Sequence, residues 1–152
     1  MMRAVIAAIA IVAGIVAGLV AVIAIALVGG LIFPSEGRID GFDAEQIVAL
    51  FPALPMGAKI AILLSWFGGA LAGAAVAKRI AGRGWAAWTL AGIFVVYVLI
   101  NVLVLPMPGW MQAIAVLAPL LGGLIANHLV AERDHVEPPR PAVREPEPDA
   151  SL

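Results

Sequence analysis

The candidate functional groups of this chain are mainly uncharged polar side chains. Those in or near its long apolar segments are Ser65, Thr89, Tyr97, Asn101, Gln112, Asn127 and His128. Hydroxyl and amide groups can hydrogen-bond a neighbouring helix or a weakly polar solute. The apolar segments contain no Asp, Glu, Lys or Arg away from their ends. Because coupled transporters usually need an ionisable group within the membrane, the sequence disfavours ion- or proton-coupled transport.

Tyr97 and Asn101 lie in the same apolar segment, four residues apart, so they share one face of a helix. With Gln112 from the following segment they form a possible polar site inside a helix bundle. Two interpretations stay open, hydrogen bonds between helices or a site for a neutral solute. The first is favoured because buried polar groups need partners in any protein.

Groups for catalysis or metal binding do not form a recognisable set. The chain has no cysteine, and one histidine in an apolar segment, His128, is poor evidence for a metal site. Ser65 is predicted deep in its segment, near the opposite face from His128 and with no carboxylate at its depth, so no Ser-His-Asp arrangement can be proposed. We therefore expect no enzyme activity, no cofactor and no metal.

The composition places the chain in a membrane. Of its 152 residues, 63% are hydrophobic and 12% are charged, whereas soluble domains average about 45–50% and 25%. The mean hydropathy is +1.07. A net charge of -1 provides no basic field for nucleic acid. The lipid bilayer is therefore the expected surrounding, and nucleic acid is not an expected partner.

Hydropathy and charge divide the chain into four membrane spans. Because about 20 apolar residues cross a hydrocarbon core of about 30 Å, helices are predicted at residues 4–28, 57–77, 85–105 and 110–130. Gly29-Gly30 is expected to loosen the end of the first helix. A cleaved signal peptide is the alternative for that segment, but its apolar run is too long for one.

The connection between the last two spans is only four residues long, which forces those helices to be antiparallel neighbours. The predicted fold is therefore an all-α integral membrane protein, with four transmembrane helices in an antiparallel bundle over residues 1–131.

Two segments lie outside the spans. A short amphipathic helix is predicted at residues 44–51, because Pro52 and Pro55 bound an apolar stretch there. It is expected to cap the outer end of the bundle; gating of a substrate is the alternative. Residues 132–152 are rich in proline and charge and cannot bury enough apolar surface to fold, so a disordered cytoplasmic tail is predicted.

Small residues recur at helical spacing in three of the spans. They are Gly14 and Gly18 in the first span, Ser65, Gly69 and Gly73 in the second, and Gly122 in the fourth. Such stripes let helices approach backbone to backbone. We expect these residues to pack helices together, within the chain and against a second copy or another membrane protein.

An ordered set of motifs runs through the spans. It consists of Phe33-Pro34, Leu54-Pro55, Trp66 with Gly68-Gly69 and Gly73, Lys78-Arg79, and Pro106-x-Pro108 with Trp110. In this order the motifs resemble a family of small, uncharacterised four-span bacterial inner-membrane proteins. The resemblance covers about residues 4 to 130. It implies the architecture and a bacterial inner-membrane location, and it implies no activity because the family has none established.

Two functions of different classes follow from these features. The favoured one is an interaction, accessory or membrane-structural protein that uses its small-residue stripes for contact. The alternative is an oligomeric channel or carrier for a neutral or weakly polar solute, using Ser65, Tyr97, Asn101 and Gln112. The first is favoured because closely packed helices leave little room for an aqueous path.

The orientation follows from the basic residues near the span ends. Arg3, Lys78, Arg79 and Arg83 are predicted on one side of the membrane, while the first loop is net acidic. Since basic residues concentrate in cytoplasmic loops, both termini are expected in the cytoplasm.

Single-cysteine labelling tests this orientation, because the natural chain has no cysteine. Asp40→Cys should react with a membrane-impermeant thiol reagent in intact cells, and Arg83→Cys should react only after the cells are opened. Labelling at position 83 but not at position 40 would overturn the predicted orientation.

Overall fold

The computed structural model of the protein describes residues 2–34 and 44–131. Every regular element in these residues is a helix. The elements are α1 (Met2–Ile32), α2 (Ala44–Leu50), the 3-10 helix η1 (Phe51–Ala53), α3 (Met56–Ala81), α4 (Gly84–Val104) and α5 (Gly109–Leu129). The disordered tail predicted at 132–152 lies outside the described residues.

Four of these helices are long and apolar enough to cross a membrane. They are α1, α3, α4 and α5, with 31, 26, 21 and 21 residues. At about 1.5 Å per residue, even 21 residues extend for about 30 Å, the thickness of a hydrocarbon core. The prediction of an all-helical chain with four such helices is confirmed.

The end of α1 differs from the prediction. The helix does not loosen at Gly29-Gly30 but continues to Ile32, and the N–H of Phe33 donates to the carbonyl oxygen of Gly29 at 2.9 Å. Gly29 is buried against α3, where a Cβ would collide with the Cβ of Ala61. Its small size therefore serves helix packing and not helix termination.

α3 also ends later than predicted, at Ala81. Gly82 ends the helix with a φ of 69°, a left-handed conformation that glycine adopts readily, and its N–H donates to the carbonyl oxygen of Lys78 at 2.8 Å. Lys78 therefore lies within the helix and is only 3% exposed. Its ammonium group donates to the backbone oxygen of Asn127 on α5 at 2.5 Å and to its side-chain oxygen at 3.1 Å. A residue predicted to mark a basic exit from the membrane thus joins two helices.

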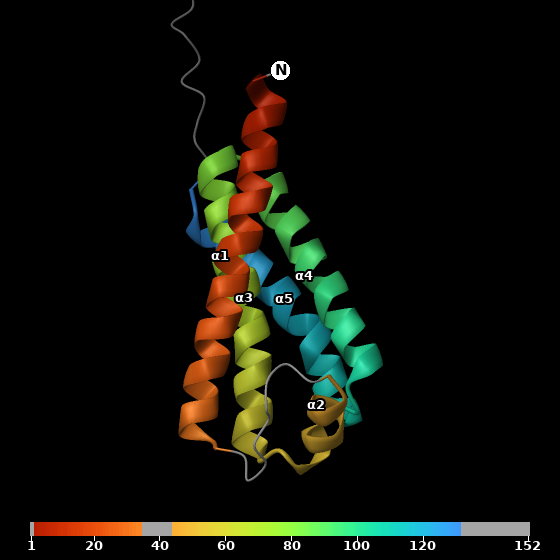
Figure 1. The fold of residues 1–152 in the computed structure, drawn as a ribbon. Coiled ribbons are helices and arrows are strands. Elements are labelled where there is room, and N and C mark those ends of the chain that lie inside the picture. The colour runs from red at the N-terminus through yellow and green to blue at the C-terminus, as the bar shows by residue number, and fades with distance from the viewer. Residues whose placement is uncertain (1, 35–43, 132–152) are drawn as a thin grey trace, which may run out of the picture.

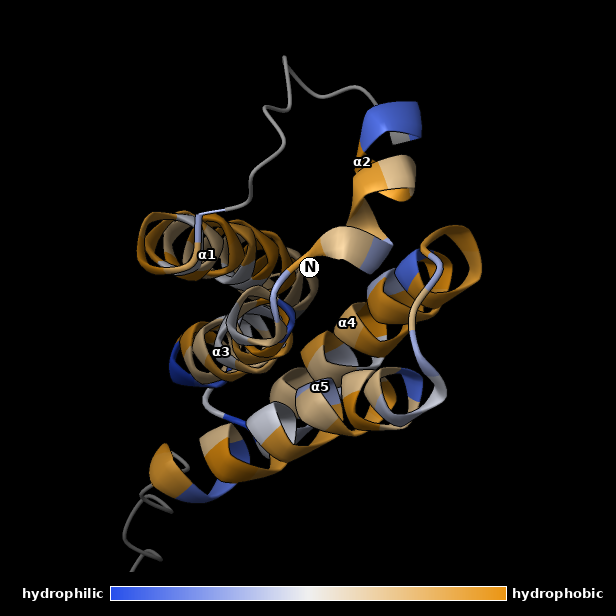
Figure 2. Cartoon of the chain, turned by 90° about the horizontal axis from the view of Figure 1, so that it is seen from below, coloured by the Kyte–Doolittle hydropathy of each residue, from blue (hydrophilic) through white to orange (hydrophobic). Residues whose placement is uncertain are grey.

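α3 lies in the middle of the molecule (Figure 1; Figure 2). It packs against α1 and against α4 and α5, and α4 and α5 pack on each other, as their short connection predicts. α1 contacts α4 much less than it contacts α3. α1 is therefore held mainly by one neighbour.

Glycines bring the backbones of α1 and α3 together. A Cβ built on Gly14 would lie 2.8 Å from the carbonyl oxygen of Gly73, and one built on Gly73 would lie 2.7 Å from that of Gly14. Gly18 and Gly69 face each other in the same way, with corresponding distances of 2.8 and 3.0 Å. Any larger residue would push the helices apart, so these predicted stripes are used within the chain.

Gly122 has the matching role on α5. A Cβ there would lie 2.7 Å from the carbonyl oxygen of Phe67 and 2.9 Å from the amide nitrogen of Leu71, both on α3. The next residue, Gly123, packs against Ala91 of α4. Two adjacent glycines therefore hold α5 close to both neighbours.

Gly73→Ala should lower the free energy of unfolding by about 1–3 kcal/mol, because it adds a methyl group to a filled interior. Gly92→Ala is the matched control, since no neighbouring helix approaches within 4 Å of the position of its missing Cβ. The control should leave stability unchanged or raise it by up to about 1 kcal/mol. Thermal or denaturant unfolding of both proteins in one detergent measures the difference. Equal stability of the two variants would contradict the close contact between α1 and α3.

Candidate functional site

A partly open cavity of about 450 Å³ lies between α1 and α4. α3 forms its floor, with Ala61 and Trp66 among the lining residues, while α1 contributes Ala26 and Gly30. Trp66 is 3% exposed. In the view along the long helices, α2 lies to one side of the bundle, and the stretch that follows it passes between α1 and α4 (Figure 2). The volume falls within the range of about 300–1,000 Å³ that is usual for small-molecule sites.

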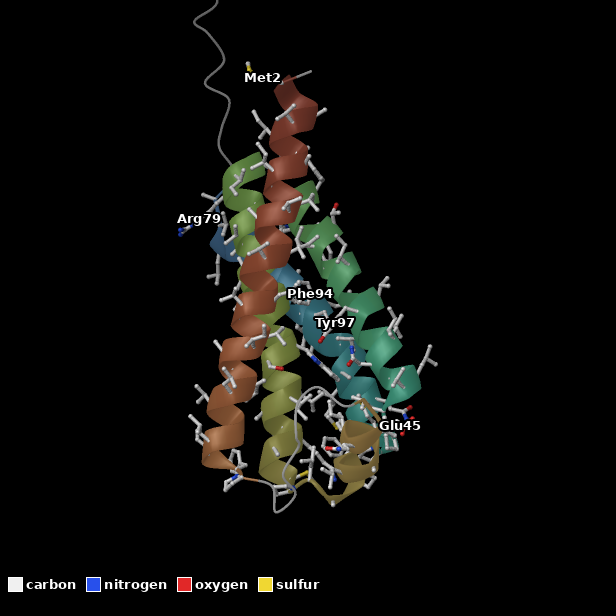
Figure 3. The ribbon with its side chains drawn as sticks, in the orientation of Figure 1. Met2, Glu45, Arg79, Phe94 and Tyr97 are labelled. Carbon is white, nitrogen blue, oxygen red and sulfur yellow. The ribbon has the colours of Figure 1, made fainter. Side chains whose placement is uncertain are left out.

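Residues 44–54, called the cover segment below, close the cavity at the end where α1 terminates. The residues of this segment that line the cavity are Ile47, Leu50, Phe51 and Leu54. Phe51 is 2% exposed, whereas Glu45 of the same segment is exposed (Figure 3). Lys59 of α3 fixes the segment by donating to the carbonyl oxygen of Pro52 at 3.0 Å. The cover segment therefore turns its apolar residues to the cavity.

Three polar side chains line the cavity, those of Ser65, Tyr97 and Asn101. Ser65 donates to the carbonyl oxygen of Ile62 at 2.7 Å, which leaves its oxygen able to accept a hydrogen bond. Asn101 donates its amide to the carbonyl oxygen of Tyr97 at 2.8 Å, so its own side-chain oxygen remains an acceptor. Among the described residues, the Tyr97 hydroxyl makes no hydrogen bond. The cavity thus offers the Tyr97 O–H and the second amide N–H of Asn101 as donors, together with several acceptors.

Phe94 sets the position of Tyr97. The two rings meet edge to face, with centroids 6.2 Å apart and planes inclined at 70°. Both side chains project from α4 toward the middle of the molecule (Figure 3). The Phe94 ring packs where α1 and α3 cross, because Cβ atoms built on Gly18 and Gly69 would both touch it. The two aromatic rings therefore connect the glycine contact between α1 and α3 to the lining of the cavity.

The structure separates the predicted polar site into two parts. Tyr97 and Asn101 lie together and are joined by Ser65, whereas Gln112 is not among the cavity residues. Gln112 is exposed and donates to the carbonyl oxygen of Met107 at 2.9 Å, within the connection before α5. Its amide serves the turn between α4 and α5 instead of the cavity.

Sequence reasoning did not assign Phe51 and Trp66 to this site. The sequence places Trp66 only in the ordered set of motifs and Phe51 only in the capping helix predicted at residues 44–51. The apolar character of the cover segment was a usable signal, because a freely solvated loop rarely carries so many apolar side chains. The partner surface of the segment could not be predicted, since it is formed by three different helices.

None of the described residues that line the cavity carries a charge. Within residues 2–34 and 44–131, no group of three His, Cys, Asp or Glu residues is arranged to hold a metal ion. No protein-family model, no curated protein and no solved structure matches the chain. Function is therefore inferred from the geometry of the site.

Phe51→Ala should open the outer end of the cavity and make Trp66 accessible to water. The variant is made in a chain in which Trp85, Trp88 and Trp110, each at least 40% exposed, are changed to phenylalanine. Trp66 is then the only fluorophore of its kind, and quenching by acrylamide should increase. Met56→Ala, at a residue that is 60% exposed, is the control and should leave quenching unchanged. An unchanged signal in Phe51→Ala would show that the cover segment does not close the cavity.

Proposed function

We propose that this chain is a multi-pass membrane protein that binds a neutral or weakly polar small molecule within the bilayer. The cavity carries this proposal, because its described lining residues combine an apolar surface with three polar side chains and include no charged group. Ligand sites commonly have this composition, with a few polar groups that fix orientation in a largely apolar space. The carrier function considered for the sequence is therefore supported by Ser65, Tyr97 and Asn101, without Gln112.

A role as an accessory or membrane-structural protein is the second candidate. The glycine stripes are occupied by contacts within the chain, so a partner would have to use another surface. α1 provides such a surface, since only 11% of the residues in its most apolar stretch are buried. Under this proposal a second copy or another membrane protein packs against α1.

The proposed location is the bacterial inner membrane, with an antiparallel bundle and both termini in the cytoplasm. Support comes from the exposed Arg79 and Arg83 at one end of the bundle and from the motifs that resemble four-span inner-membrane proteins. In this orientation the cavity and the cover segment occupy the outer half of the membrane.

Ala26→Phe should abolish ligand binding by filling the cavity. Ala26 lines the cavity, and its position on the exposed part of α1 avoids the glycine contacts. Ala24→Phe adds the same ring to the same helix at an exposed position outside the cavity lining, so it is the matched control.

Native mass spectrometry of the protein released from native-lipid nanodiscs measures the outcome. We expect a bound molecule on the wild type and on Ala24→Phe, and none on Ala26→Phe. A bound molecule that persists in Ala26→Phe, or a wild type that carries none, would contradict a ligand site in this cavity.

A further inference from the structure

We propose that the ligand of the cavity is an uncharged amphiphile with a hydroxyl head and a hydrocarbon body, which enters from the bilayer between α1 and α4. The inference rests on the proposed function, because it names the chemical class of the molecule that the cavity binds. Three observations carry it: the hydrogen-bonding groups left free, the uncharged character of the described lining residues, and the position of the cover segment.

The free hydrogen-bonding groups fit a hydroxyl. The Tyr97 O–H can donate to a ligand oxygen, and the side-chain oxygens of Asn101 and Ser65 can accept from a ligand O–H. A hydroxyl both donates and accepts, whereas a ketone or an ether can only accept. A hydroxyl therefore uses both kinds of group that the cavity offers.

The rest of the lining fits a hydrocarbon and excludes an ionic head. Apolar side chains from α1, α3 and the cover segment surround the polar group, as Val22, Ile62 and Leu50 illustrate. Among the described residues, the lining provides no cation for a carboxylate or phosphate, and burial of an unpaired charge is strongly unfavourable. Lys59, the nearest basic residue of α3, instead donates to Pro52 of the cover segment.

The position of the cover segment indicates a lateral route. Phe51 and its neighbours close the cavity at the end of the bundle, while α1 and α4 make few contacts with each other. Exposed apolar residues follow the lining residues on both helices, such as Ile23 on α1 and Ile100 on α4. Such exposed side chains suit contact with acyl chains and not with water, so a ligand that enters between the two helices comes from the lipid.

Fluorescence quenching of Trp66 by brominated probes tests the proposal. The full chain with Trp66 as its only tryptophan is placed in nanodiscs and titrated with 16-carbon chains that carry bromine along the chain. One probe is the alcohol, one is the carboxylate at neutral pH, and one is the hydrocarbon without a head. Because Trp66 is 3% exposed and lines the cavity, quenching reports entry of the chain.

The alcohol should quench at concentrations at least about tenfold lower than the carboxylate and roughly two- to tenfold lower than the hydrocarbon, the effect of one or two hydrogen bonds. Tyr97→Phe should reduce the advantage of the alcohol over the hydrocarbon, because it removes the phenolic donor and leaves the acceptors of Asn101 and Ser65. Thr89→Val, which removes a hydroxyl from α4 at an exposed position outside the cavity lining, should leave it intact.

Three results would overturn the proposal in different ways. Equal quenching by all three probes, with loss of quenching in Ala26→Phe, would contradict the hydroxyl class and leave the binding function standing. A preference for the alcohol that is undiminished in Tyr97→Phe would contradict the assigned donor. No quenching by any probe would contradict both the ligand class and the binding function.

Discussion

The backbone contact between α1 and α3 is the interaction on which the rest of the structure depends. Gly14 and Gly18 meet Gly73 and Gly69 so closely that no side chain fits between them. The Phe94 ring packs at this crossing and holds Tyr97 edge to face. One set of small residues thus fixes the main neighbour of α1 and, through two aromatic rings, the polar side of the cavity.

The cavity follows from the way α1 is held. Because α1 packs chiefly on α3, it leaves space beside α4 in the half of the bundle beyond Phe94. The cover segment fills the end of that space with apolar side chains, and Ser65, Tyr97 and Asn101 remain on its inner walls. The helices therefore pack closely near Phe94 and leave a partly open cavity nearer the cover segment. For this reason the small-residue stripes are compatible with a binding function.

Local sequence patterns predicted the helices, whereas contacts between residues far apart in the sequence determine how the helices pack and where the cavity forms. Four apolar segments could be recognised because hydropathy is a property of each segment alone, and the spacing of Gly69 and Gly73 identified a packing face. The role of Gly29 could not be predicted, since the same residue type can end a helix or pack against Ala61. The partner of Lys78 is 49 residues away, and the cavity combines residues from four helices and η1. Neither the hydrogen bond nor the cavity could therefore be predicted from one segment alone.

The most direct test of the account uses the single tyrosine of the chain. The protein is deuterated except for its phenylalanine residues and the ring of Tyr97, which keep hydrogen. Nuclear Overhauser effects measured in nanodiscs then report which groups contact the Tyr97 ring. The account predicts cross-peaks from Tyr97 to Phe94 and to the aliphatic protons of a bound uncharged amphiphile. Cross-peaks to phenylalanine without any to an added alcohol, or a ring in contact with bulk water, would contradict a lipid-accessible ligand site positioned by the glycine contact.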